Sequence, residues 1–222
     1  MKPYYDHAGI TIYHGDCREV MPQLPQVDAV VTDPPYGIAY RSGMTGHNGG
    51  VSLPGIEGDE DTSLRDYVIQ WAAGKPAIVF GSWKRSRPQG TRMVLTWHKG
   101  SHVGMGDIET PWKPNTEEVY IIGRGFSGHH DSSVLDYPAL VSWNSTKHGR
   151  KHAHEKPVGL MKALVSKCPD GTILDPFMGS GSTLVAAKLC GRKAIGIEIE
   201  ERYCEIAANR LAQEVLPFAS LS

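Results

Sequence analysis

Short apolar runs alternate with amphipathic segments along this chain. Runs rich in β-forming residues, such as Asp28–Thr32 and Ala77–Phe80, are interspersed with helical patterns, such as Ser63–Ala73 and Ser182–Leu189. This alternation is typical of a mostly parallel sheet that is covered on both faces. We therefore expect a single-domain α/β fold in which about seven mostly parallel strands are flanked by helices.

The individual elements follow from the same pattern. The predicted strands are Ile10–His14, Asp28–Thr32, Ala77–Phe80, Met93–Trp97, Val119–Ile122, Thr172–Leu174 and Ala194–Ile197. The predicted helices are Arg18–Leu24, Ser63–Ala73, Gly159–Lys167, Ser182–Leu189 and Glu201–Leu216. Gly191 and Pro169 fit the ends of the two helices that precede them.

Length, charge and cysteine content narrow the class of protein. The 222 residues carry a formal net charge of −1 and four widely spaced cysteines. This length suits one domain, residues 1–222, and any basic surface for nucleic acid must be local because the overall charge is balanced. Without a Cys-x-x-Cys pair, reduced thiols are expected rather than a zinc ribbon. No stretch resembles a signal region or could span a bilayer, so we expect a cytoplasmic protein with no membrane partner.

The motif Asp33-Pro34-Pro35-Tyr36 follows directly on the buried strand that ends at Thr32. The Asp33 carboxylate and the Pro34 carbonyl offer acceptors to a planar NH₂ group, and the Tyr36 ring offers a face for stacking. The two prolines have fixed φ and no N–H, so these acceptors stay aimed. The motif therefore predicts a site that holds a planar amine.

A second site is predicted where the strand Thr172–Leu174 ends. Asp175-Pro176-Phe177 leads into Gly179-Ser180-Gly181, and a helix begins near Ser182. Glycines at such a turn let a ligand approach the backbone, and the helix start supplies free N–H donors. The next strand ends in Glu198, an acid of the kind that binds ribose hydroxyls. These features indicate a nucleoside-bearing cofactor.

The cofactor turn is neither of two common nucleotide motifs. It lacks the third glycine of a dinucleotide fingerprint, and no lysine follows its glycines as in a P-loop. A dinucleotide-dependent oxidoreductase would use this turn and Glu198 but leaves Asp33–Tyr36 unexplained. A non-catalytic DNA-binding module would need neither site.

Two loop regions do not belong to the scaffold. Residues 38–61 are rich in glycine and follow Tyr36, which makes them a candidate flexible lid. Residues 123–150, with the stretch up to His154, concentrate basic and titratable side chains and form a small candidate target-recognition region. Three histidines, His148, His152 and His154, do not complete a recognisable zinc site, so no metal is expected.

The two sites together resemble those of the amino-methylating DNA methyltransferases, which form N6-methyladenine or N4-methylcytosine from S-adenosylmethionine. The matching stretches are Asp33–Gly37, Asp175–Gly181, His152–Pro157 and Tyr13–Cys17. Their order, with the catalytic half first, is similar to the β-type permutation of that family. The resemblance covers almost the whole chain apart from the two loop regions, and it implies the Rossmann-like fold of S-adenosylmethionine-dependent methyltransferases.

The resemblance also implies roles for individual residues. The flipped base would be held by the catalytic motif Asp33, Pro34, Pro35 and Tyr36. The cofactor would be bound by Asp16, Cys17, His152, Lys156, Pro157, Asp175, Pro176, Phe177, Gly179, Ser180, Gly181 and Glu198. The family commonly shows the stretch His-Pro-Ser/Thr-Glu/Gln-Lys-Pro. This chain has Ala153 and His154 at the second and third places, while His152 and Lys156 keep their register.

The expected reaction is methylation of the exocyclic N6 of adenine in double-stranded DNA after base flipping. Asp-Pro-Pro-Tyr is more typical of the adenine branch, and N4-methylation of cytosine is the alternative. Both loop regions would recognise a short target sequence. The expected location is the cytoplasm of a bacterial or phage-infected cell, in association with the nucleoid. An RNA or protein amine substrate stays open, as do a homodimer and a partner restriction nuclease.

Overall fold

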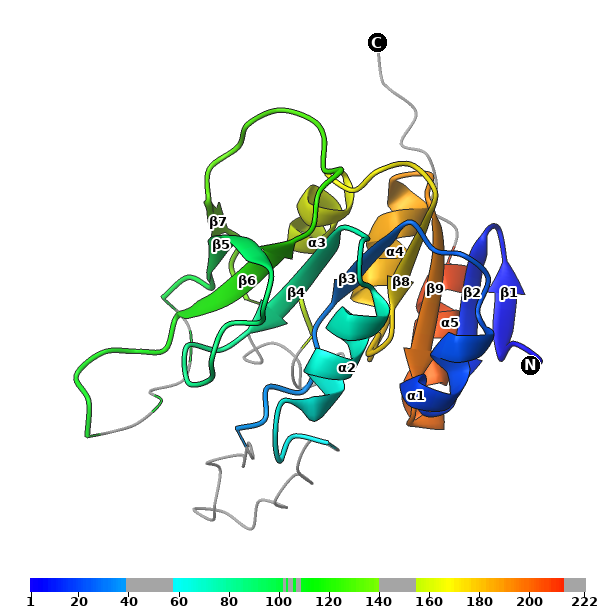
Figure 1. The fold of residues 1–222 in the computed structure, drawn as a ribbon, viewed down its shortest axis with the longest axis horizontal. Helices are drawn as coiled ribbons and strands as arrows, with labels where there is room; N and C mark the ends of the chain where they lie inside the picture. The colour runs from blue at the N-terminus through cyan, green and yellow to red at the C-terminus, as the bar shows by residue number, and fades with distance from the viewer. Residues whose placement is uncertain (39–57, 102, 104–105, 107–108, 140–154, 214–222) are drawn as a thin grey trace.

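The computed structural model describes residues 1–38, 58–101, 103, 106, 109–139 and 155–213, which form one sheet flanked by helices (Figure 1). Within these residues the sheet has nine strands in the order β1-β2-β9-β8-β3-β4-β6-β5-β7. The strands are β1 (Tyr5–His7), β2 (Ile10–His14), β3 (Ala29–Thr32), β4 (Ala77–Gly81), β5 (Thr91–His98), β6 (Thr116–Ile122), β7 (Val134–Asp136), β8 (Thr172–Asp175) and β9 (Lys193–Glu198). The helices are α1 (Cys17–Val20), α2 (Ser63–Trp71), α3 (Val158–Val165), α4 (Ser182–Leu189) and α5 (Glu201–Ala212), with a 3-10 turn η1 at Met21–Gln23.

Five neighbouring strands, β2-β9-β8-β3-β4, run parallel to one another. Beyond them, β6 pairs with β4 and β5 pairs with β6 in antiparallel fashion. The expected mostly parallel sheet is confirmed, and each of the seven predicted strands is present. The sequence did not predict β1 and β7, which have three residues each and lie at the two edges of the sheet. So short a run carries too little periodicity to be told from a loop.

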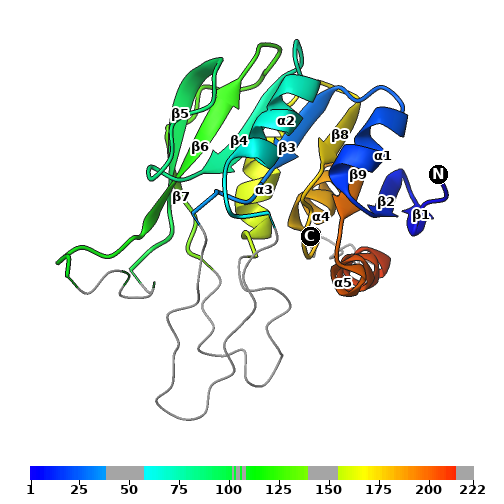
Figure 2. The same cartoon turned by 60° about the horizontal axis from the view of Figure 1, so that its bottom comes forward.

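Successive residues of the central strands pack into two separate cores. On β3, Ala29 and Val31 face one core and Val30 faces the other, and Ile78 and Val79 of β4 divide in the same way. The first core includes apolar side chains from α3, α4 and α5, and the second includes those of α1 and α2. Figure 2 shows these two groups of helices on opposite sides of the sheet. Burial on both faces explains why the strands appear in the sequence as continuous apolar runs.

The predicted helices differ from the observed ones mainly at their ends. The first begins at Cys17, where Asp16 is the N-cap, and gives way to the 3-10 turn that contains Pro22. The last ends at Ala212 rather than Leu216, and positions beyond 213 lie outside the described residues. None of the helices in the described part of the chain is long and apolar enough to cross a lipid bilayer.

The chain changes its direction of progress across the sheet between β3 and β8. β3 leads through α2 to β4 on one side, whereas β8 leads through α4 to β9 on the other. The carboxyl ends of two such strands flank the usual ligand site of an open α/β sheet. Here the Thr32 hydroxyl at the end of β3 donates to Asp175 Oδ1 at the end of β8 over 2.7 Å, across a sequence separation of 143 residues. This bond holds the two predicted motifs at one edge of the sheet.

The Asp175 carboxyl is buried behind that edge, with 3% of the residue exposed. It also accepts hydrogen bonds from the Thr183 hydroxyl and, at 3.2 Å, from the Phe177 amide. Burial raises the pKa of Asp175 to about 6, although these hydrogen bonds act to lower it. The folded protein therefore binds this proton more tightly than the unfolded chain does.

We expect Asp175→Asn to gain stability relative to the wild type as the pH rises. In the wild type, the raised pKa of Asp175 contributes to stability fully below the ordinary pKa of the carboxyl, and this contribution is lost as the pH rises through about 6. The amide of the variant does not titrate, so its stability has no such contribution. The difference in the free energy of unfolding should therefore shift in favour of the variant by up to about 3 kcal/mol between pH 4 and pH 7. Urea denaturation at several pH values measures it. Asp170→Asn, at an exposed position before β8, is the control, and a pH-independent difference for Asp175→Asn would contradict the assignment.

Candidate active site

The segment Asp33-Pro34-Pro35-Tyr36 follows the last residue of β3. The Tyr36 hydroxyl donates to Asp33 Oδ1 at 2.7 Å and lies 3.1 Å from Glu117 Oε2. Burial and the two nearby carboxylates raise the pKa of Tyr36 well above its ordinary value. The phenol therefore keeps its proton and acts as a donor to the carboxylates on either side of it.

Lys156 closes the other side of this segment. Its Nζ donates to Asp33 Oδ2 and lies 3.3 Å from Glu117 Oε2. The ring centroids of Phe80 and Trp97 are 4.9 and 5.5 Å from Nζ, and only 9% of the lysine side chain is exposed. Burial by itself lowers the pKa of Lys156, but the attraction of the two carboxylates outweighs burial and raises it. The ammonium group therefore stays charged in an aromatic, water-poor setting.

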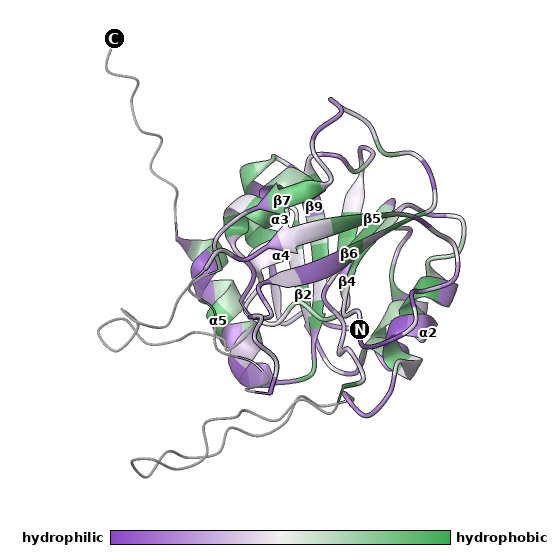
Figure 3. Cartoon of the chain, turned by 90° about the vertical axis from the view of Figure 1, so that its left-hand side faces the viewer, coloured by the Kyte–Doolittle hydropathy of each residue, from purple (hydrophilic) through white to green (hydrophobic). Residues whose placement is uncertain are grey.

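Glu117 stands at the start of β6 and completes the charge balance of the site. Its Oε1 accepts a hydrogen bond of 3.2 Å from Lys99, while Oε2 faces Tyr36 and Lys156. Burial acts to raise the pKa of Glu117, but the two ammonium groups outweigh it and lower the pKa. Figure 3 shows β6 with a hydrophilic stretch beside more hydrophobic parts of the sheet. Asp33, Lys156, Glu117 and Lys99 thus form a chain of alternating charge, referred to below as the charge network.

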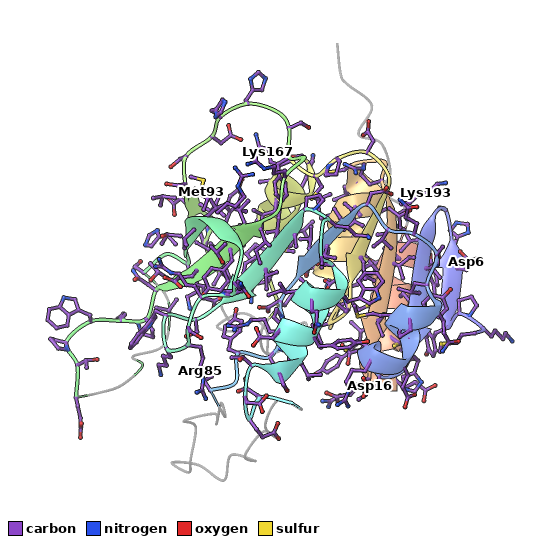
Figure 4. The ribbon with its side chains drawn as sticks, in the orientation of Figure 1. Asp6, Asp16, Arg85, Met93, Lys167 and Lys193 are labelled. Carbon is purple, nitrogen blue, oxygen red and sulfur yellow. The ribbon has the colours of Figure 1, made fainter. Side chains whose placement is uncertain are left out.

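The turn after the catalytic motif is held by contacts that are distant in sequence. Gly37 has a φ of +72°, and a Cβ there would lie 2.5 Å from the backbone carbonyl carbon of Asp61. The buried Asp59 carboxylate accepts a hydrogen bond of 2.6 Å from the Gly37 amide, and the Arg85 guanidinium donates to the Gly37 carbonyl. Figure 4 shows Arg85 along the same edge of the sheet as Asp16. Only glycine meets both the backbone and the space requirement at this turn.

The predicted cofactor turn joins β8 to α4 and is tied to the end of β9. The Glu198 carboxylate accepts two hydrogen bonds of 2.9 Å, from the Gly179 amide at Oε2 and from the Glu200 amide at Oε1. Burial raises the pKa of Glu198. Gly181 has a φ of +81°, and a Cβ there would lie 2.8 Å from the Ala207 Cβ on α5. The turn is therefore packed closely under α5, which fixes the path of its backbone.

A cavity of about 320 Å³ opens beside the carboxyl ends of β8 and β9. Its lining includes five of the residues predicted to bind the cofactor: Asp16, Cys17, Pro176, Phe177 and Glu198. Ser182 is not among the lining residues, but its hydroxyl, in the first turn of α4 directly after the glycine turn, is buried and has no hydrogen-bond partner among the described residues. Buried polar atoms without partners are uncommon, and pockets of this size accept small organic ligands. The residues present therefore fit a nucleoside-bearing cofactor.

Arg210 of α5 connects the glycine turn to the segment that carries Lys156. Its guanidinium donates to the Ser180 carbonyl at 2.7 Å and to the Ser180 hydroxyl at 2.9 Å. The same guanidinium pairs with the Glu155 carboxylate at 2.8 Å, and both side chains are largely buried. One side chain thus sets the separation between the two halves of the site.

The other predicted residues are distributed as follows. Asp16 pairs with Arg18 at the edge of the cavity, and Pro157 is the N-cap of α3. Lys156 contacts the catalytic motif rather than lining the cavity. His152 lies outside the described residues, as do the other two histidines considered for a metal, residues 39–57 of the glycine-rich region and residues 140–150 of the candidate target-recognition region. In the described part of the chain, no group of three or more His, Cys, Asp or Glu side chains is arranged to hold a metal ion.

A model of the DNA methylase family, N6_N4_Mtase, matches residues 84–209, which is more than half of the chain. The chain belongs to this DNA methylase family. It is therefore an amino-methylating DNA methyltransferase of the N6-adenine or N4-cytosine class.

Curated relatives of this methylase match it over nearly their full length. A protein named putative methylase YubD from Escherichia coli (strain K12) is 29% identical over 214 residues, covering 89% of this chain and 88% of the relative. Type II methyltransferase M.ScaI from Streptomyces caespitosus is 26% identical, covering 96% of this chain and 84% of the relative. Type II methyltransferase M2.MboI from Moraxella bovis is 25% identical, with 98% and 93% covered.

Solved structures support the fold of the methylase. The complex of M1.HpyAVI with S-adenosylmethionine (SAM) superposes with a TM-score of 0.60 at 23% identity, covering 90% of this chain and 99% of that one. The cytosine-N4-specific PvuII DNA methyltransferase superposes with a TM-score of 0.72 at 16% identity, covering 97% and 90%. At these identities the likeness concerns the fold alone.

Several residues that shape the site were not predicted from the sequence. Glu117 and Lys99 lie on or beside strands that were predicted only as scaffold. Asp59 falls within the glycine-rich region, and Arg85 and Arg210 lie in segments with no motif of their own. An acid at the start of a strand is the one signal that could have singled out Glu117, and it is weak because exposed strand ends often carry charges.

We expect Arg210→Met to weaken binding of S-adenosylmethionine by about tenfold, because the variant keeps the aliphatic stem but loses the charged hydrogen bonds to Ser180 and Glu155. Isothermal titration of the cofactor against the purified protein measures the change. The control is Arg202→Met on the same helix, whose guanidinium is exposed and pairs with Glu200. Equal affinities for the two variants would show that Arg210 does not control the glycine turn.

Proposed function

We propose that this methylase transfers a methyl group from S-adenosylmethionine to the exocyclic N6 of adenine in double-stranded DNA. The observation that carries the proposal is the meeting of the two motifs at one edge of the sheet. The Thr32–Asp175 hydrogen bond joins the strand that leads into Asp33 to the strand that leads into the cofactor turn. This supports a site in which a group bound at Asp33 would lie next to a cofactor held at the turn after β8.

At the catalytic motif, Asp33 and the Pro34 carbonyl accept the two hydrogens of the target amine. This favours a pyramidal nitrogen, which is a better nucleophile than the planar, delocalised one. Tyr36 stacks on the flipped base and offsets part of the few kcal/mol that leaving the duplex costs. The Asp33 carboxylate also stabilises the positive charge that develops on nitrogen, and accepts or passes on its proton after transfer.

At the cofactor turn, Glu198 holds the ribose hydroxyls and the glycine turn surrounds the methionine portion. Asp16 and Cys17 border the adenine ring. When bound, S-adenosylmethionine supplies a methyl group activated by its sulfonium. The new C–N bond forms as the methyl–sulfur bond breaks, which leaves neutral S-adenosylhomocysteine, and the amine then releases one proton.

The first residue of the catalytic motif supports adenine as the target. Asp33 stands where the N4-cytosine branch more typically has serine. The fold does not discriminate between the two bases, because the cytosine-N4-specific PvuII enzyme shares it. N4-methylation of cytosine therefore remains the second candidate.

We assign target reading to residues 38–61 and 123–150, which in the described part of the chain serve the fold mainly through β7 and the Asp59 contact to Gly37. Base contacts by Arg or Lys in these regions would discriminate by about 1–3 kcal/mol each. The names of M.ScaI and M2.MboI as type II methyltransferases support a role in restriction-modification.

We expect the purified protein to form N6-methyladenine when it is incubated with labelled S-adenosylmethionine and unmethylated DNA. Asp33→Ala should lower the rate by at least about 100-fold, because the variant loses the acceptor that faces the developing charge. Nucleoside mass spectrometry measures the product, and S-adenosylhomocysteine binding by the variant checks its folding.

Asp6→Ala, at the far edge of the sheet, is the matched control and should keep full activity. N4-methylcytosine as the product would overturn the choice of base but keep the mechanism. The absence of any methylated base, despite cofactor binding, would overturn DNA as the substrate.

We expect a sequenced methylome of cells expressing this chain to show one short target, because the two candidate reading regions are small. Long-read sequencing that detects modified bases makes the measurement in a host lacking its own adenine methylation. A long, asymmetric target modified by the isolated monomer would contradict the assignment of these two regions as the reader.

A further inference from the structure

Both oxygens of the Asp33 carboxylate are already engaged in this structure. Oδ1 accepts the Tyr36 hydroxyl, and Oδ2 pairs with the Lys156 ammonium. A target amine has to share or take one of these positions to be accepted by Asp33. If the proposed methylation of an exocyclic amine takes place here, that position must be cleared when the amine binds.

The charge of Lys156 opposes the reaction at this position. The target nitrogen becomes positively charged as the methyl group arrives, and an ammonium on the same carboxylate repels that charge. Such repulsion is strong where water is scarce, and the lysine side chain is only 9% exposed. The ring centroids of Phe80 and Trp97 lie 4.9 and 5.5 Å from Nζ, so moving the ammonium out to bulk solvent would also lose these cation–π contacts.

Glu117 offers Lys156 a second acceptor within reach. Its Oε2 is already 3.3 Å from Nζ, so a small shift of the ammonium exchanges one carboxylate for the other. Lys99 holds Oε1 at 3.2 Å and keeps the Glu117 side chain directed toward the site. The Tyr36 hydroxyl, 2.7 Å from Asp33 and 3.1 Å from Glu117, bridges the same two acceptors.

We propose that Glu117 is a positioning residue that draws Lys156 away from Asp33 when the target amine binds. The exchange leaves Oδ2 of Asp33 free to accept an amine hydrogen. The lysine remains paired, so no buried charge is left without a partner during the exchange. Glu117 does not touch the base and acts only through Lys156.

The test compares Glu117→Gln, Glu117→Asp and Glu118→Gln under single-turnover conditions with saturating labelled S-adenosylmethionine and DNA. Glu117→Gln should lower the rate of methyl transfer by at least about tenfold, because the neutral amide cannot hold the ammonium against Asp33. Glu117→Asp keeps the charge and should retain more activity than Glu117→Gln. Glu118→Gln, on the same strand but paired with Arg87, should stay within about twofold of the wild type.

The affinity for S-adenosylmethionine and the midpoint of thermal unfolding are measured on the same variants. A positioning role predicts a loss in rate with the cofactor affinity unchanged within about twofold. A merely structural role predicts that the near-isosteric Gln is tolerated better than the shorter Asp. Wild-type rates for Glu117→Gln, or greater activity for Gln than for Asp, would overturn the proposal.

Lys156→Met provides the second half of the test. If Glu117 acts through Lys156, Glu117→Gln should change the rate by less than about twofold in the Lys156→Met background. The same loss in both backgrounds would mean that Glu117 acts through Tyr36 or on the base directly, not through Lys156, and would overturn the proposal. If Lys156→Met is inactive, the order of the Asp and Gln variants decides the question. A wild-type protein that methylates no nucleic acid would instead reject the proposed function, so the two failures are distinguishable.

Discussion

The hydrogen bond from Thr32 to Asp175 is the constraint on which the arrangement of the site depends. It links the ends of β3 and β8, the two strands between which the chain changes direction across the sheet. The Asp175 carboxyl accepts hydrogen bonds from the hydroxyls of Thr32 and Thr183, so it has a structural role at this edge of the sheet. The base site and the cofactor site are therefore held in register by the scaffold itself.

The charge network imposes a second requirement on the same edge. Asp33, Lys156, Glu117 and Lys99 bring two negative and two positive charges into a partly aromatic setting. Buried charges of this kind are tolerated when each has a partner, and removing one partner costs more than the pair contributes. The site is thus neutral before substrate arrives, and a positive charge that develops at Asp33 adds to a network in which each negative charge already has a partner.

The fold could be predicted from the sequence because its signals are local. Continuous apolar runs marked the seven longer strands, and burial on two faces explains those runs, whereas β1 and β7 were too short to be recognised. For the site, Asp33 and the glycine turn were visible because their residue types and order are unusual. Glu117, Asp59 and Arg210 were not, since each acts on a residue far away in sequence and none belongs to a local pattern. The pairing of Lys156 with Asp33 was missed for the same reason.

The antiparallel direction of β6 has a consequence for how such sites are assembled. Because β6 runs opposite to β4, its first residues arrive at the edge where the parallel strands end, and Glu117 is among them. Lys99 comes just after β5, and its amide bonds the Asn115 carbonyl just before β6. The ion pair of Glu117 and Lys99 thus joins the two strands of one β-hairpin. If related proteins exchanged this hairpin, Glu117 and Lys99 would move together as a neutral pair. The rest of the two strands could then differ in sequence and length without changing the net charge near the catalytic motif.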